Sequence, residues 1–115
     1  MNFRRGDFAL VYFPHSDLRI VRLRPVLVVQ ADDLSTSLPQ IIVAMVTSNM
    51  SRAGHASRIT VRLEDPGVAQ AGLKSDSVIM TDNLATIELQ LIERRIGRMA
   101  RMEMVDQALR NTLGL

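Results

Sequence analysis

The chain has 115 residues, a formal net charge of +2 and no cysteine. Without cysteine it can form neither a disulfide framework nor a thiolate metal site. Its length is typical of one domain, and 47% hydrophobic residues suffice for a core, so we expect one globular domain over residues 1–115. The longest apolar runs are strand-sized and no signal-peptide pattern is visible, so we expect no membrane span and a cytoplasmic protein.

The basic side chains are almost all arginines, because thirteen arginines accompany the single Lys74. A guanidinium binds two phosphate oxygens at once, so this composition favours a phosphate-containing partner. A genome that prefers arginine codons, or ordinary solvated surfaces, would explain the same pattern. The arginines form two groups that could line one groove, namely Arg4, Arg5, Arg19, Arg22 and Arg24 near the N-terminus and Arg94, Arg95, Arg98 and Arg101 near the C-terminus.

Short runs of β-branched and aromatic residues dominate the first half of the chain. The first run predicts a strand buried on both faces, because apolar residues fill all of its positions until Pro14 stops it. A long polar loop follows, and such loops often carry function. The expected elements are a strand at 8–13, a loop at 14–23, a strand at 25–30, a polar connection at 32–39, a strand at 41–48 and a loop at 51–57.

The last element differs in period from the others. Met102, Val105, Leu109 and Leu113 recur at spacings of three and four, which predicts an amphipathic helix over residues 101–113 with Gly114 as its C-cap. Before it we expect a strand at 58–63, a turn at 65–67, a strand at 77–82, a helical turn within 88–93 and a short strand at 95–98. The fold is therefore predicted to be mainly β with one helix, as a small barrel or strongly bent sheet.

Sequence blocks that contain Gly6-Asp7, Arg24-Pro25 and Thr47-Ser48 resemble the MazF/PemK toxin family, in the same order and with similar spacing over nearly the whole chain. Residues 6–18 run from Gly-Asp through a strand that reaches Phe-Pro, and residues 24–30 begin with Arg-Pro and continue as an apolar strand. Residues 42–48 end in Thr-Ser as the corresponding family strand does, and residues 72–79 resemble its Gly-Leu-x-x-x-Ser strand. Residues 82–87 and 95–99 match the last family blocks.

This resemblance implies an SH3-like small β-barrel of five to seven short strands with a C-terminal helix packed on it. It also implies a homodimer that cleaves single-stranded RNA, such as mRNA, at specific short sequences and thereby inhibits growth. The expected products are a 2′,3′-cyclic phosphate and a 5′-hydroxyl, formed without a metal or cofactor. A cognate antitoxin is expected to neutralise the toxin by wrapping a disordered segment around it.

Two residues are the main candidates for the cleavage site. Arg24 ends the polar loop immediately before Pro25, and the resemblance places the catalytic arginine at this Arg-Pro step. A guanidinium can clamp the charge that develops on the phosphate, but it is a poor base because it stays protonated. Thr47 resembles the family threonine that hydrogen-bonds the scissile phosphate, and Ser48 could assist it. Each residue could instead be an ordinary surface or strand residue.

The polar loop supplies further candidates. His15 could accept the proton of the attacking 2′-hydroxyl, because imidazole titrates near neutrality, and Asp17 could orient His15 or Arg24. Arg19 and Arg22 are expected to contact flanking phosphates. An exposed histidine without a role, an Asx-turn at Asp17 and solvated arginines are the plain alternatives. The loop departs from the family at Ile20 and Val21, where small residues are usual.

A few other residues complete the predicted site. Ser77 and Asp82 could line the cleft or cap turns. All four aromatic residues, Phe3, Phe8, Tyr12 and Phe13, precede the polar loop, so any platform for stacking on bases must come from them, although most are expected in the core. With only two histidines, a metal site has little support.

Two other functions fit the same resemblance. The same barrel serves toxins that bind DNA gyrase through protein contacts, and fold alone does not decide between the two activities. The altered residues 19–22 would also permit an inactive module that only binds RNA or a partner. Met99, Met102 and Met104 could form an apolar dimer contact, or simply pack in the core.

Overall fold

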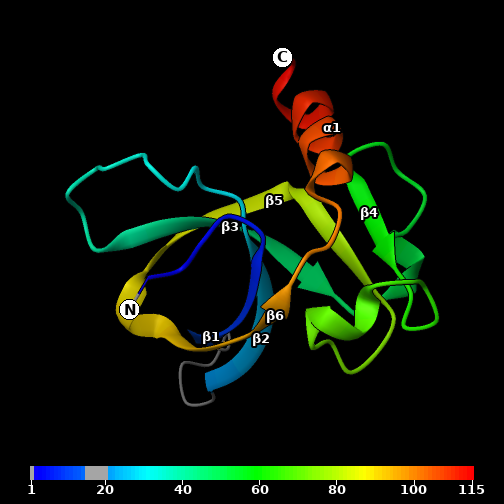
Figure 1. The fold of residues 1–115 in the computed structure, drawn as a ribbon, viewed down its shortest axis with the longest axis horizontal. Coiled ribbons are helices and arrows are strands. Elements are labelled where there is room, and N and C mark those ends of the chain that lie inside the picture. Colours follow the sequence, from blue (N-terminus) through cyan, green and yellow to red (C-terminus); the bar gives the residue numbers. More distant parts are fainter. Residues whose placement is uncertain (1, 15–20) are drawn as a thin grey trace.

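The computed structural model describes residues 2–14 and 21–115 of the chain. Its strands bend strongly around a common interior, and α1 stands at one end of them (Figure 1). The predictions at His15, Asp17 and Arg19 lie outside the described residues. The elements are β1 (Asp7–Pro14), β2 (Val21–Val28), β3 (Gln40–Thr47), η1 (Met50–Arg52), β4 (Arg58–Val61), η2 (Val68–Ala71), β5 (Ser77–Glu88), η3 (Leu89–Leu91), β6 (Ile92–Arg98) and α1 (Met102–Leu113).

The strands form one antiparallel sheet in the order β4-β5-β3-β2-β1-β6. Mainly β structure with a terminal helix is as predicted, and six strands fall within the predicted five to seven. The sheet is not a closed barrel, because within residues 2–14 and 21–115 the outer strands β4 and β6 each pair on one side only. The bent-sheet form of the prediction is therefore the right one.

A close backbone contact joins η2 to β6. Gly72 has a φ of +71°, and a Cβ added there would lie 2.0 Å from the carbonyl oxygen of Ile96. A Cβ added to Gly97 would lie 2.2 Å from the carbonyl oxygen of Gln70. Only glycine allows two backbones to approach so closely. η2 thus packs directly on β6, and we call this contact the η2–β6 wall.

Neighbouring residues of the central strands enter two different core clusters. Phe8 and Leu27 belong to the first cluster, on which α1 packs through Val105, whereas Ala9 and Val26 belong to the second. All five side chains are fully buried, so the expectation that the first strand is buried on both faces holds at its start. Two packed faces therefore hold β1 and β2 in place.

The helix matches its prediction closely. α1 buries Val105 and Ala108, and Gly114 ends it in the left-handed conformation, with its N–H donating to the carbonyl oxygen of Arg110 at 2.9 Å. Met102 and Leu109 pack against the first core cluster, as the periodicity requires. Leu113 is 55% exposed, because it lies in the last turn, beyond the sheet. No helix in the described part of the chain is long and apolar enough to cross a membrane.

Three predicted boundaries were wrong by three residues or more. β2 begins at Val21, so residues 21–23, expected in the loop, pair with β1. β5 continues to Glu88 instead of ending at Asp82, because its pairing with β3 resumes at Leu84 after a break in register at residues 81–83. β6 begins at Ile92, before the expected start at Arg95. The helical turn expected within residues 88–93 is η3, while η1 and η2 were not predicted.

Candidate nucleic-acid interface

A cavity of about 530 Å³ opens where β2 begins and β3 ends. This size is within the range of about 300–1,000 Å³ that is usual for ligand sites. β1, β6 and the segment before β5 complete its lining, which includes the η2–β6 wall through Gly72 and Ile96. The lining residues are Leu10, residues 22–25, residues 46–48, residues 72–75, Ser77, Arg94 and Ile96. We call this space the cationic cavity, because its lining includes arginine and lysine side chains.

Arg24 and Thr47 both line the cationic cavity. The sheet register explains why they meet. Val26 of β2 pairs directly with Met45 of β3. Arg24 lies two residues before Val26, and Thr47 lies two residues after Met45. Because the strands are antiparallel, the register, if continued, places Arg24 and Thr47 opposite each other on the same face. Arg24 is exposed and Thr47 is half-buried, so both can be reached from solvent.

The turn that follows β3 holds the Thr47 hydroxyl. The backbone N–H of Asn49 donates to Thr47 Oγ1 at 3.1 Å, and the Asn49 side chain in turn accepts from the N–H of Ser51, where it caps η1. A hydroxyl that accepts one hydrogen bond can still donate its own proton. Thr47 is therefore oriented by the backbone and able to donate to an oxygen in the cavity.

The lining carries positive charge. Among residues 2–14 and 21–115, four cationic side chains contribute to it, those of Arg22, Arg24, Lys74 and Arg94, and none of the lining residues is Asp or Glu. Outside the lining, Glu93 pairs with Arg94 Nη1 at 2.6 Å, but the Arg94 side chain is still 57% exposed. Like charges that converge on one hollow attract an anionic ligand, and a phosphodiester strand brings one such charge per nucleotide.

The remaining candidates are divided between this cavity and another part of the sheet. Ser48 is exposed at the cavity, whereas Ser77 is 3% exposed and its hydroxyl donates to the carbonyl oxygen of Ser75 at 2.9 Å. Asp82 does not line the cavity. Its carboxylate accepts two hydrogen bonds from Arg58 of β4 instead, at 3.2 and 2.8 Å. These hydrogen bonds lower the pKa of Asp82 and raise that of Arg58.

Only one arginine of the C-terminal group reaches the cationic cavity, and it is Arg94. Arg98 Nη1 donates to Oδ1 of Asp7, a carboxylate that is 1% exposed, and Arg95 lies 3.7 Å from the same oxygen. Oδ2 of Asp7 accepts from the backbone N–H of Arg4 at 2.8 Å. These contacts fasten the end of β6 to the start of β1, so the predicted joining of two basic groups holds only in part.

Lys74 was missed as a candidate. It is exposed and lines the cationic cavity, and within the described residues no carboxylate pairs with it. An isolated lysine carries no signal in sequence. Its position in the block that starts at Gly72 was the only available hint, since that block was matched to a family strand.

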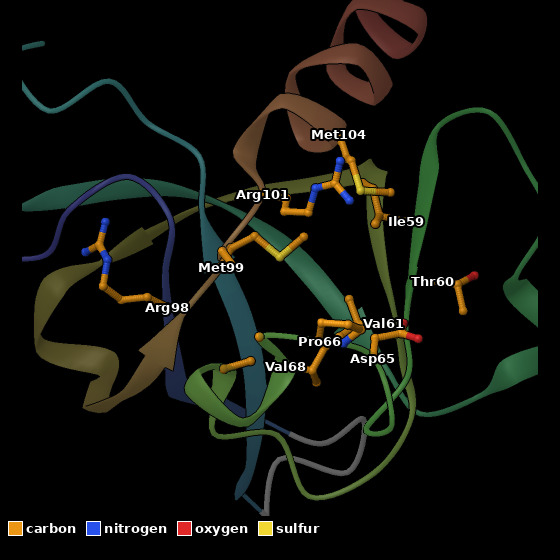
Figure 2. Close-up of a pocket in the computed structure, with 13 residues that line it drawn as sticks. Ile59, Thr60, Val61, Asp65, Pro66, Val68, Arg98, Met99, Arg101 and Met104 are labelled. Atoms are coloured by element: carbon orange, nitrogen blue, oxygen red, sulfur yellow. The ribbon is translucent and has the colours of Figure 1, made fainter.

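A second cavity, of about 360 Å³, lies on the other side of the η2–β6 wall, between β4 and the start of α1. Figure 2 shows Met99, Met104 and Ile59 around it, with the Arg98 side chain turned away. We call it the methionine cavity. Met99 and Met102 pack against the first core cluster, which favours the core-packing interpretation for these two, whereas Met104 is 44% exposed.

No group of three His, Cys, Asp or Glu side chains comes together in a way that could hold a metal ion, within residues 2–14 and 21–115. His55 has a local contact instead, because its Nδ1 accepts from the backbone N–H of Ser57 at 3.0 Å. The side chains that gather at the cationic cavity are cations and hydroxyls. Guanidinium and ammonium groups bind anions and have no lone pair to offer a metal ion.

Comparison with known proteins is consistent across sequence and structure. The family described as the PemK-like, MazF-like toxin of type II toxin-antitoxin systems matches residues 4–113. "Endoribonuclease EndoA" of Bacillus subtilis (strain 168) is 32% identical over 123 aligned positions, which cover 100% of this chain and 97% of that protein.

Solved structures share the fold. "Mycobacterium tuberculosis toxin MazF-mt6" has a TM-score of 0.73 at 24% identity, over 95% of this chain and 97% of that one. A mycobacterial "Endoribonuclease in complex with its cognate antitoxin" has a TM-score of 0.74 at 18% identity, over 98% of this chain and 96% of that one. At these identities the structural likeness concerns the fold alone.

Proposed function

Because the chain belongs to the PemK-like, MazF-like toxin family of type II toxin-antitoxin systems, we propose that it is an endoribonuclease that cuts single-stranded RNA. The observation that carries this proposal is the cationic cavity, which Arg24 and Thr47 line together with three further cations and, in the described part of the chain, without a carboxylate. The relative from Bacillus subtilis, named an endoribonuclease and similar over the full length of this chain, supports the same activity.

RNA needs no metal-bound water to be cut, because its own 2′-hydroxyl can attack the neighbouring phosphorus. The bond from phosphorus to the 5′-oxygen then breaks, which leaves a 2′,3′-cyclic phosphate and a 5′-hydroxyl. The protein has to stabilise the charge on the five-coordinate phosphorus, take a proton from the 2′-hydroxyl and give one to the leaving oxygen. We propose this metal-independent route for the chain.

Arg24 binds the non-bridging phosphate oxygens in this mechanism, and Thr47 donates a hydrogen bond to one of them. Both groups act more strongly as negative charge builds up, which is the condition for lowering the barrier. Arg22 and Ser48 lie beside them and contact the flanking strand. Ser77, whose hydroxyl already donates to Ser75, is best suited to shaping the wall of the cavity.

The proton transfers are assigned to the segment between β1 and β2. His15 remains the candidate base and Asp17 its orienting partner, while Arg19 remains a candidate phosphate ligand. These three assignments rest on residue chemistry alone. Asp82 is not included in the site, because its carboxylate is engaged by Arg58.

The partners follow from the family. We propose that a cognate antitoxin neutralises the toxin, as the mycobacterial relative solved with its antitoxin suggests, and that the toxin acts as a homodimer. A cytoplasmic location fits a substrate such as mRNA. A gyrase-binding toxin of the same fold is the second candidate function, but a cavity lined by four cations is better suited to phosphates than to a protein surface.

The test is to incubate the purified protein with a long RNA, with and without EDTA, and to map the fragment ends. We expect cleavage that resists EDTA, ends that carry cyclic phosphate, and a loss of about 10²–10³-fold in rate for Arg24→Ala, as for removal of one oxyanion ligand. Arg101→Gln is the matched control, since Arg101 is 68% exposed and lines the methionine cavity instead.

The outcomes separate the candidates. Full activity in Arg24→Ala would disprove the site assignment. Intact RNA together with inhibition of gyrase would replace the nuclease by the second function.

A further inference from the structure

Tyr12 is the only aromatic residue of the chain with a largely exposed ring. Phe8 is fully buried, and Phe3 and Phe13 are partly buried against the second core cluster. Tyr12, by contrast, is 41% exposed. All four aromatic residues of the chain are among the described residues, so the comparison is complete. Tyr12 is therefore the one aromatic side chain that is available to a ligand, because the other three contribute to packing.

The register of β1 and β2 places this ring at the rim of the cationic cavity. Leu10 lines the cavity, and Tyr12 lies two residues further along the same strand, on the same face of the sheet. Directly opposite, Tyr12 pairs with Leu23, which also lines the cavity and lies between Arg22 and Arg24. Paired residues of neighbouring strands project to one face, so Tyr12 extends the row formed by these two leucines. Arg24 pairs with Val11 and therefore projects from the opposite face of β2.

A tyrosine at this place has the chemistry that a single-stranded nucleic acid requires. Phosphate contacts hold the backbone, while the bases of an unpaired strand need flat partners on which to stack. The cationic cavity supplies the phosphate contacts, but none of the four aromatic residues, all of which the structure describes, is part of its lining. The only exposed ring of the protein lies next to it.

We propose that Tyr12 stacks on a base of the RNA strand that is bound at the cationic cavity. This inference rests on the proposed function and adds to it the residue that holds a base. Stacking depends on the face of the ring and not on its hydroxyl. It contributes to binding more than to bond cleavage, so loss of Tyr12 raises KM and leaves kcat nearly unchanged.

The sequence provides a direct probe of this contact. Tyr12 is the only tyrosine and the chain has no tryptophan, so the intrinsic fluorescence of the protein comes from the proposed stacking residue. The ligand is an RNA that contains the mapped cleavage site, with a 2′-O-methyl group at the nucleotide to be cut so that it cannot react. We expect saturable quenching with the same Kd as an independent binding assay, after correction with free tyrosine for light absorbed by the RNA.

Variants test the energetic role. Tyr12→Leu should weaken binding by about 5- to 150-fold, the contribution of one stacked base, whereas Tyr12→Phe and Tyr12→Trp should retain affinity. An abasic nucleotide is then moved along the RNA. At one position it should weaken binding to the wild type and cause no further loss in Tyr12→Leu. The control is Leu38→Ala, which removes another exposed apolar side chain, 57% exposed, at the opposite end of the strands.

Several results would overturn the inference while leaving the nuclease intact. They are unchanged Tyr12 fluorescence at saturating RNA, equal losses in Tyr12→Phe and Tyr12→Leu, or a changed oligomeric state in Tyr12→Leu with unchanged RNA affinity. The last result would make Tyr12 a protein contact. A wild-type protein that neither binds nor cuts RNA would instead defeat the proposed function itself.

Discussion

The two cavities share one wall but differ in chemistry. The η2–β6 wall contributes Gly72 and Ile96 to the cationic cavity and Ala71 and Arg98 to the methionine cavity. The first gathers cations and hydroxyls at strand ends. The second gathers methionine, valine and isoleucine between β4 and α1, and its arginines are paired with Asp7 and Glu103. Arg98, held by the buried Asp7, therefore fastens the fold, whereas Arg22 and Arg24 line the cationic cavity.

The sharpest way to test this difference is to remove one hydroxyl from the cationic cavity. Thr47→Val keeps the shape of the side chain and its preference for a strand, but it can no longer donate to a phosphate oxygen. We expect kcat to fall by about 10²–10³-fold with little change in KM, the usual effect of losing one donor to a developing oxyanion.

The control comes from the methionine cavity. Thr60→Val removes the same hydroxyl from β4, where Thr60 lines that cavity, and should leave RNA cleavage unchanged. Equal kinetics for the two variants would mean that Thr47 has no special role. Both rates are to be measured on one RNA of known cleavage site.

The next largest effect is expected in the wall that separates the cavities. In Gly97→Ala the new methyl group would meet the carbonyl oxygens of Gln70 and Ala71 at 2.2 and 2.4 Å, so one backbone has to move. Overpacking of this kind usually costs about 1–3 kcal/mol of folding free energy. Urea unfolding of the wild type and the variant would measure it.

Gly54→Ala serves as the comparison for Gly97→Ala. Gly54 has a φ of +91°, and nothing lies within 4 Å of an added Cβ, so this variant reports the cost of backbone conformation alone. If Gly97→Ala were as stable as the wild type, the backbone of η2 or β6 could move without cost. The two cavities would then not be separated by a rigid contact.

The fold was more accessible from the sequence than the site was. Alternation and apolar runs located the strands, and the spacing from Met102 to Leu109 located α1, because burial imposes those periods. β5 was cut short at Asp82 because residues 81–83 interrupt its register with β3, and backbone pairing that resumes at Leu84 leaves no marked pattern in the side chains. The η2–β6 wall depends on contacts between distant backbones, and a single glycine in a sequence does not reveal its neighbour.

Residues of the candidate site differed in the same way. Arg24 and Thr47 were proposed together only because of a family resemblance, since their encounter depends on the register of β2 and β3. Lys74 was missed because nothing local marks it. Tyr12 was one of four aromatic residues until burial set it apart. The sequence shows the chemistry of each side chain, but the register of the sheet determines which side chains lie close together.

Lys74 gives the smallest expected effect and tests the cationic cavity as a whole. The Lys74→Met variant keeps the aliphatic stem and removes one charge from the lining, so it should weaken RNA binding without changing kcat. If Lys74 contacts a phosphate, the slope of log K against log salt should become shallower by about 0.7, the value for one phosphate on a single strand.

Arg101→Gln, which removes one charge from the methionine cavity, should leave that slope unchanged. An identical slope in wild type and Lys74→Met would restrict the phosphate path to the side of the cavity formed by β2 and β3, whereas a parallel loss in Arg101→Gln would show that overall charge, and not the position of the cations, governs binding.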